Sequence, residues 1–213
     1  MITEADVVLT DYGLAIESGV LAWLIRRGSD PKQPLPRWFA LLFSATSVAS
    51  LTGGTVHGFF LDPTTAGARI LWPMALIALG GAALAAWGIG AHMQFSEDAA
   101  RWVSRAATLG FAVYTGVVLL GSQRFMIAVI NYLPAVAFLL FAYVVAYRRL
   151  RQRVVLLGAV GILLTFVAAG VQQAKLGLHP RYVTHNALYH IIQGVSLFLV
   201  FASARRIVGR GPC

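Results

Sequence analysis

Long apolar stretches alternate with short polar or basic segments along the whole chain. A helix that crosses the hydrocarbon core of a bilayer needs about 20 predominantly apolar residues. By this criterion we predict membrane-spanning helices at residues 7–26, 38–61, 68–91, 102–121, 126–147, 154–174 and 184–203. The pattern shows no internal repeat and no second domain. We therefore expect an all-α membrane protein in which residues 1–213 form one seven-helix transmembrane bundle.

The segments between the spans carry turn and capping signals. A proline-rich stretch, SDPKQPLPR, joins the first two spans, and LDPTTAGAR joins the second and third. Between the sixth and seventh spans, KLGLHPRYVT contains Pro180, which we expect to break the helix. In the same stretch Thr184 is placed to cap the seventh helix.

Basic residues gather at one end of the predicted bundle. Of the 17 lysines and arginines, the four on the side of the N-terminus are Arg69, Arg124, Lys175 and Arg181. The remaining 13, on the side of the C-terminus, are Arg26, Arg27, Lys32, Arg37, Arg101, Arg105, Arg148, Arg149, Arg151, Arg153, Arg205, Arg206 and Arg210. Short loops rich in lysine and arginine stay in the cytoplasm. We therefore predict that the N-terminus lies outside and the C-terminus in the cytoplasm.

The composition of the 213 residues also indicates a membrane protein. Hydrophobic residues make up 58% of the chain and charged residues 12%, whereas a soluble domain carries about 25% charged residues. A net charge of +9 would suit nucleic acid, but the basic residues lie in short loops, as topology signals do. We expect no nucleic-acid partner, and we predict a multi-pass protein of the bacterial inner membrane or another cell membrane.

The two ends of the chain narrow the possibilities further. The N-terminal residues are acidic and lack the basic region of a cleavable signal peptide, so we expect none. The single cysteine, Cys213, allows no intramolecular disulfide and no metal cluster built from cysteines.

Polar residues inside the spans concentrate in the half nearer the N-terminal side. Members of this layer are Asp11, Glu17, Ser50, Thr52, Thr55, His57, Tyr114, Thr115, Asn131, Tyr132, Gln172, Gln173, His185, Asn186, His190 and Gln193. Polar groups in an apolar setting cost free energy unless they are satisfied, so we interpret the layer as a cavity that opens outward. Glu17 lies about ten residues into its span, and we expect it to be buried and hydrogen-bonded near this cavity.

Helical geometry brings part of this layer together. Asn186, His190 and Gln193 stand at i, i+4 and i+7, so they form one stripe of the last helix. At 1.5 Å per residue, His57 and His190 lie about 6 to 9 Å below the outer ends of their helices and can meet at one depth. His185 points about 140° away from His190 on an ideal helix, and it joins them only if the first turn is irregular. The residues expected to line the cavity are Asn186, Gln193 and Gln172.

Histidines from two distant helices, with carboxylates nearby, suit a zinc ion. Catalytic zinc takes three protein ligands and keeps one position open for water, whose pKa it lowers to about 7. If zinc is bound, the predicted ligands are His57, His185 and His190. Asp11 or Glu17 would then serve as the proton shuttle. Such a site would act on the acyl groups of membrane lipids. If His185 turns away, one of the carboxylates of Asp11, Glu17 and Asp62 must complete the set, or no catalytic zinc site forms.

This layout resembles the CREST superfamily, which contains alkaline ceramidases, progestin/adipoQ receptors and GPI-remodelling fatty-acid hydrolases. Its members have seven spans, a serine four residues before a histidine in an early helix, an aspartate soon after, and a His-x-x-x-His pair in the last helix. Three of the histidines bind zinc. His57, near the end of the second span, and HNALYH in the seventh are similar in placement. The resemblance implies a zinc-dependent hydrolase of lipid amide or ester bonds.

The chain departs from that motif at two places. Because glycine stands four residues before His57, the candidates for the serine and the aspartate are Ser50 and Asp62. In the last helix asparagine stands four residues before His190, and the histidine is displaced to His185. Either the last helix shifts its register to admit His185, or the metal is weak, different or absent.

Other function classes fit the same residues. A lipid-binding or small-molecule-binding protein, such as a receptor, would use the polar cavity without catalysis. A b-type haem or quinone redox protein would use His57 and His190 as axial ligands. Retinal binding is disfavoured because neither Lys32 nor Lys175 lies mid-membrane in the last span, and a transporter because the spans show no repeat.

Overall fold

The computed structural model describes residues 2–30 and 32–208, and this part of the chain forms seven α-helices. They are α1 (Ala5–Arg27), α2 (Pro34–Phe59), α3 (Ala66–Gln94), α4 (Glu97–Leu120), α5 (Phe125–Leu150), α6 (Arg153–Gln173) and α7 (His185–Val208). Each is long and apolar enough to cross a membrane, and each overlaps one predicted span. The prediction of an all-α, seven-helix membrane protein is therefore confirmed. Arg210 and Cys213 lie outside the described residues.

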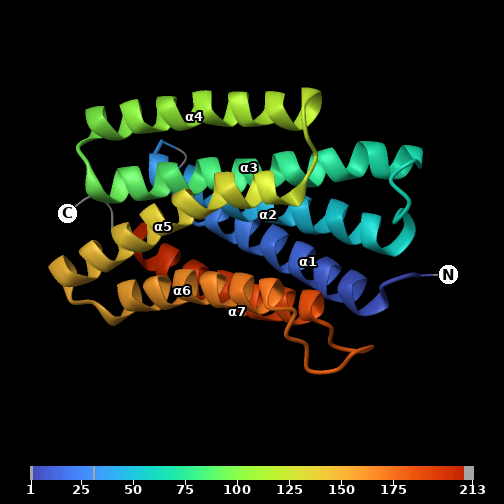
Figure 1. The fold of residues 1–213 in the computed structure, drawn as a ribbon. Coiled ribbons are helices and arrows are strands. Elements are labelled where there is room, and N and C mark those ends of the chain that lie inside the picture. The colour runs from blue at the N-terminus through green and yellow to red at the C-terminus, as the bar shows by residue number, and fades with distance from the viewer. Residues whose placement is uncertain (1, 31, 209–213) are drawn as a thin grey trace.

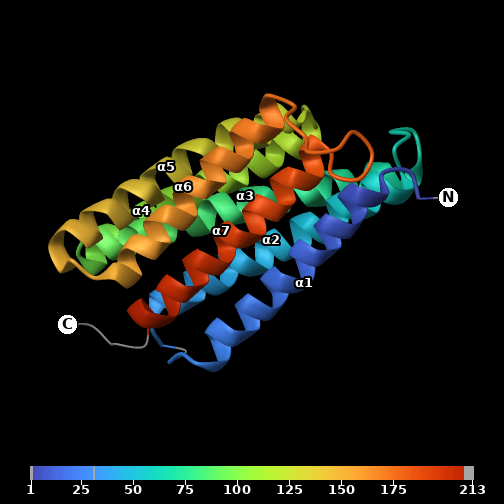
Figure 2. The same cartoon turned by 90° about the horizontal axis from the view of Figure 1, so that it is seen from below.

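Six of the described helices form a closed ring, and α4 lies outside it. Going round the ring, neighbours pack in the order α1, α2, α3, α5, α6 and α7, and α7 returns to α1. The fourth helix packs against the outer side of α3 (Figures 1 and 2). Many of its exposed side chains are apolar, such as Trp102, which is 69% exposed, and Leu120, which is 92% exposed. An apolar surface of this kind suits contact with lipid rather than water.

Local signals explain several helix ends. The hydroxyl of Thr184 accepts a hydrogen bond from the backbone N–H of Ala187 at 3.5 Å, so the predicted cap of α7 is confirmed. Pro34 begins α2, where a missing N–H costs nothing. Pro180 does not end α6, contrary to prediction, because the helix stops at Gln173. Lys175, with φ of 54°, turns the chain there, and Pro180 lies within the following loop.

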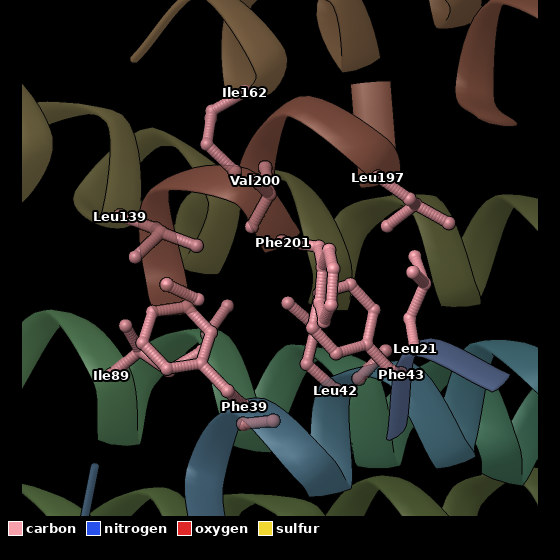
Figure 3. Packing of buried hydrophobic residues seen from close by; sticks show 14 of the residues in the cluster. Leu21, Phe39, Leu42, Phe43, Ile89, Leu139, Ile162, Leu197, Val200 and Phe201 are labelled. Carbon is pink, nitrogen blue, oxygen red and sulfur yellow. The ribbon is translucent and has the colours of Figure 1, made fainter. Parts of the chain in front are cut away.

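The interior of the ring is packed with apolar side chains at the end where α7 finishes. Six helices supply this core, whose labelled members in Figure 3 are Leu21, Phe39, Leu42, Phe43, Ile89, Leu139, Ile162, Leu197, Val200 and Phe201. The rings of Phe43 and Phe201 meet edge to face with their centroids 6.1 Å apart. This tight end holds the helices together and leaves the opposite end of the ring free for a cavity.

Candidate binding cavity

A cavity of about 320 Å³ lies inside the ring, at the end where α1, α3, α5 and α7 begin. This volume is at the lower end of the range for ligand pockets in proteins. All six ring helices contribute to its wall. The polar residues of the wall are Asp11, Thr46, Ser50, His57, Trp72, Tyr132, Thr165, Gln172, Gln173, Asn186, Tyr189, His190 and Gln193.

Two adjacent glycines of α2 shape one side of the cavity. A Cβ added at Gly53, which lines the cavity, would meet no atom within 4 Å. A Cβ added at Gly54 would lie 2.7 Å from Cβ of Asp11. Gly54 therefore allows α1 to approach α2 closely and to present Asp11 to the cavity, while Gly53 leaves space in front of it.

His190 of α7 is held by two consecutive residues of α1. Its Nδ1 lies 3.2 Å from the hydroxyl of Thr10, and its Nε2 lies 3.2 Å from Oδ1 of Asp11. The side chains of His190 and Asp11 are only 12% and 5% exposed. Nearby, the carboxylate of Asp6 accepts a hydrogen bond from the backbone N–H of Thr184 at 3.0 Å. The beginnings of the first and last helices are thus joined by polar contacts.

The hydrogen-bond directions around His190 can be assigned. Thr10 gives its single hydroxyl hydrogen to a backbone carbonyl, that of Asp6 at 2.9 Å or Val7 at 3.0 Å, so it accepts from Nδ1 of His190. With Nδ1 protonated, one further proton lies between Nε2 and the carboxyl of Asp11. Whether it resides on the imidazole or on the carboxyl, the pair as a whole carries no net charge.

His57 of α2 is paired with a carboxylate at the start of the chain. Its Nδ1 lies 2.5 Å from Oε2 of Glu4, and the hydroxyl of Thr3 donates to the carbonyl of Gly58 at 3.2 Å. These contacts fix the segment that precedes α1 against the end of α2. His57 also lines the cavity, so it and His190 face one chamber.

A chain of buried hydrogen bonds joins α6 and α7 behind the cavity wall. Nε2 of Gln193 donates to the hydroxyl of Thr165 at 3.4 Å, and that hydroxyl lies 2.8 Å from the hydroxyl of Ser196. Ser196 in turn donates to the carbonyl of Gly161 at 2.7 Å. Oε1 of Gln193 is buried and has no hydrogen-bond partner within residues 2–30 and 32–208. Gln172, the other glutamine that we expected to line the cavity, donates a hydrogen bond to Oδ1 of Asn186 at 3.3 Å.

The predicted zinc ligands are not assembled in this arrangement. Both ring nitrogens of His190 contact α1, and His185 is not among the residues that line the cavity. Within the described residues, no group of three His, Cys, Asp or Glu side chains is placed to hold a metal ion. The residues present therefore do not fit a three-ligand zinc site.

Two of the predicted catalytic residues lie away from the cavity. Glu17 lines a groove between α1 and α7 on the outside of the bundle, where its Oε2 would lie 2.8 Å from a Cβ added at Gly194. It is half-buried, and no hydrogen bond or ion pair of its carboxylate occurs in the described chain, so our expectation that it is hydrogen-bonded was wrong. Asp62 lies in the exposed loop after α2. The backbone N–H and hydroxyl of Thr64 bind its carboxylate and lower its pKa.

Several residues of the site escaped sequence analysis. They are Glu4, Thr10, Thr165 and Tyr189. Thr165 carried a usable signal, because it is a polar residue in the middle of the apolar sixth span. Thr10 precedes Asp11, and helical geometry alone does not reveal that both contact one histidine. Glu4 stands before the first helix, in a segment whose path the sequence does not predict.

The chain belongs to a family of unknown function (DUF6962), whose model matches residues 7–208. No curated protein and no solved structure matches the chain.

Proposed function

We propose that this member of the family binds a small amphiphilic molecule, a lipid or acyl compound taken from the membrane, in the cavity inside its helix ring. The observation that supports the proposal is the composition of the wall. Of the 27 residues that line it, 13 are leucine, valine, alanine or phenylalanine from α1, α2, α3, α5 and α6, and 13 carry polar groups, among them Asp11, His190 and Gln193. Pockets that combine apolar side chains with convergent polar groups are typical of small-molecule sites.

An amphiphile satisfies both parts of this wall. Its acyl chain would bury apolar surface, at about 25 cal/mol per Å² removed from water. Its polar end would supply partners to buried polar groups that otherwise remain unsatisfied, such as Oε1 of Gln193. The setting, a bundle of membrane-spanning helices, makes membrane lipid the available source, in the bacterial inner membrane or another cell membrane.

A zinc-dependent hydrolase of the CREST type is the second candidate. It is favoured because His57 and His190, two of the histidines that carry the resemblance, line one cavity with Asp11. Within the described residues these side chains are not placed close enough together to hold a metal ion as a group of three, so we place binding without catalysis first. Axial ligation of haem by His190 is disfavoured because both its ring nitrogens already have protein partners.

Trp72 provides a direct test of binding, because it lines the cavity and the other four tryptophans do not. We suggest replacing Trp23, Trp38, Trp87 and Trp102 by phenylalanine and titrating the purified protein with 11-bromoundecanol, whose bromine quenches indole fluorescence on contact. Saturable quenching of Trp72 is expected.

The matched control for this titration is Gly53→Leu, which places a larger side chain in the open space of the cavity. Quenching that saturates in the parent protein and is lost in Gly53→Leu supports the proposal. Quenching that rises without saturation, equally in both proteins, would show only partition into detergent and would overturn it.

A further inference from the structure

The orientation of the Gln193 side-chain amide is set by the hydrogen bonds behind it. The hydroxyl of Ser196 donates its one hydrogen to the carbonyl of Gly161, so it must accept a hydrogen bond from the hydroxyl of Thr165. Thr165 has then used its own hydrogen and can only accept from Gln193. The NH₂ group of Gln193 therefore points to Thr165.

Its carbonyl oxygen is left as an unused acceptor. Gln193 is only 4% exposed and lines the cavity, and Oε1 has no donor within the described residues. An unpaired buried acceptor of this kind costs about 1–3 kcal/mol. A molecule in the cavity can remove that cost only by offering a hydrogen-bond donor, so a ligand that carries acceptors alone would leave it in place.

The charges around the cavity also disfavour an anionic ligand. Within residues 2–30 and 32–208, neither lysine nor arginine lines it. The two histidines of the wall are each paired with a carboxylate, His190 with Asp11 and His57 with Glu4, so neither offers an uncompensated positive charge. A carboxylate or phosphate placed here would be a desolvated anion without a counter-charge, which is strongly unfavourable.

We propose that the ligand is an uncharged, single-chain amphiphile whose polar end is a hydroxyl that donates a hydrogen bond to Oε1 of Gln193. This inference rests on the proposed function and specifies its ligand. A hydroxyl also accepts hydrogen bonds, and Tyr132 and Tyr189 on the same wall have hydroxyl groups that can donate them. The small volume of the cavity favours one chain over two.

Three probes of equal chain length separate the alternatives in the Trp72 titration. They are 11-bromoundecanol, which has a donor and no charge, methyl 11-bromoundecanoate, which has acceptors only, and 11-bromoundecanoate at pH 8, which is an anion. The alcohol is expected to bind about tenfold more tightly than the ester, as one hydrogen bond to a buried acceptor predicts. The anion is expected to bind more weakly than the alcohol.

Two variants test the role of the amide. Gln193→Leu should raise the Kd of the alcohol about tenfold and leave that of the ester unchanged, and the unchanged ester affinity shows that the cavity is intact. Thr165→Val removes the acceptor that fixes the NH₂ group, so the amide can turn over and donate to a carbonyl. In this variant the ester should gain affinity, and the preference for the alcohol should disappear.

The outcomes are distinguishable from failure of the proposed function. If all three probes bind saturably with equal Kd, or if the anion binds most tightly, the hydroxyl proposal is overturned while the binding function stands. Loss of affinity for the alcohol and the ester together in Gln193→Leu would likewise overturn it. If no probe quenches Trp72 saturably, the binding function itself fails, and the inference fails with it.

Discussion

Oδ1 of Asp11 in α1 lies 3.2 Å from Nε2 of His190 in α7, which joins the first and last helices of the ring. The same imidazole contacts Thr10, one residue earlier in α1. Because both carboxyl and imidazole are nearly buried, each depends on the other as a polar partner. The pair therefore has a structural role, in closing the ring, as well as a place in the cavity wall.

Removing the carboxyl should destabilise the protein, while an amide should replace it. In Asp11→Ala, Nε2 of His190 loses its partner, and the free energy of unfolding is expected to fall by about 1–3 kcal/mol. In Asp11→Asn, the amide N–H can donate to Nε2, because Nδ1 already carries a hydrogen for Thr10. We therefore expect the loss in Asp11→Asn to be under about 1 kcal/mol.

Denaturation of the two purified variants in detergent, compared with the parent protein, measures this difference. Equal destabilisation by Asn and Ala would mean that a hydrogen bond from a neutral amide does not replace the carboxyl, and it would contradict the expected rescue by asparagine.

Adjacent glycines in α2 give a second prediction with an internal control. Gly54→Ala places a methyl group 2.7 Å from Cβ of Asp11, and the overpacking should cost about 1–3 kcal/mol. Gly53→Ala meets no atom within 4 Å, and it gains up to about 1 kcal/mol from helix propensity. Thermal unfolding should therefore shift in opposite directions for the two variants. A destabilised Gly53→Ala would show that no open space lies in front of this residue.

The seven helices were predictable because a membrane-spanning helix follows from the length and apolarity of a segment, without knowledge of its neighbours. Helix ends were less accurate. The start of α2 was placed at residue 38, whereas its first turn begins at Pro34. The order of the ring and the position of α4 outside it depend on packing between helices, and no periodicity in one segment encodes them.

The sequence predicted how deep in the membrane the candidate site lies, but it predicted only part of the side-chain contacts there. Periodicity placed Asn186, His190 and Gln193 on one face, and all three line the cavity. It could not assign Glu17, because a polar residue at the right depth faces either the interior or the outer groove according to the rotation of its helix. The rotation of α1 is fixed by the close approach at Gly54 and by the contacts to His190, which are long-range.

Metal analysis separates the binding function from the zinc hydrolase implied by the CREST resemblance. Because both nitrogens of His190 contact α1 and a third ligand is not in place, we expect purified protein to contain well below one zinc per chain. A chelator should leave its thermal midpoint unchanged. His92, in the last turn of α3 and outside the cavity wall, provides a control. One equivalent of zinc, lost in both His57→Ala and His190→Ala but kept in His92→Ala, would favour the hydrolase.

The distribution of basic residues predicts the orientation in the membrane. The last turns of α1, α5 and α7 carry Arg26 and Arg27, Arg148 and Arg149, and Arg205 and Arg206. These helix ends lie at one end of the bundle (Figure 1). The cavity lies at the other end, because the residues that line it belong to the beginnings of α1, α5 and α7. A reporter fused after residue 213 should therefore be active only in the cytoplasm. Activity on the other side would reverse the side on which the cavity opens.

Glu17 gives the last prediction, because an intramembrane carboxylate without a partner is expensive. A charged residue at the centre of a membrane-spanning helix costs about 2.5–3.5 kcal/mol on insertion scales, and Glu17 lies near the middle of α1. Half-buried in the groove beside Gly194, it makes no hydrogen bond within the described residues that would offset this cost. Glu17→Leu is therefore expected to raise the free energy of unfolding by about 1–3 kcal/mol, and Glu17→Gln, which removes the charge and keeps the shape, by less.

Because Glu17 does not line the cavity, quenching of Trp72 by 11-bromoundecanol should be the same in both variants as in the parent protein. A loss of stability in Glu17→Leu would show that the carboxylate has a stabilising partner, and a loss of quenching with stability unchanged would place Glu17 on the path by which the ligand enters.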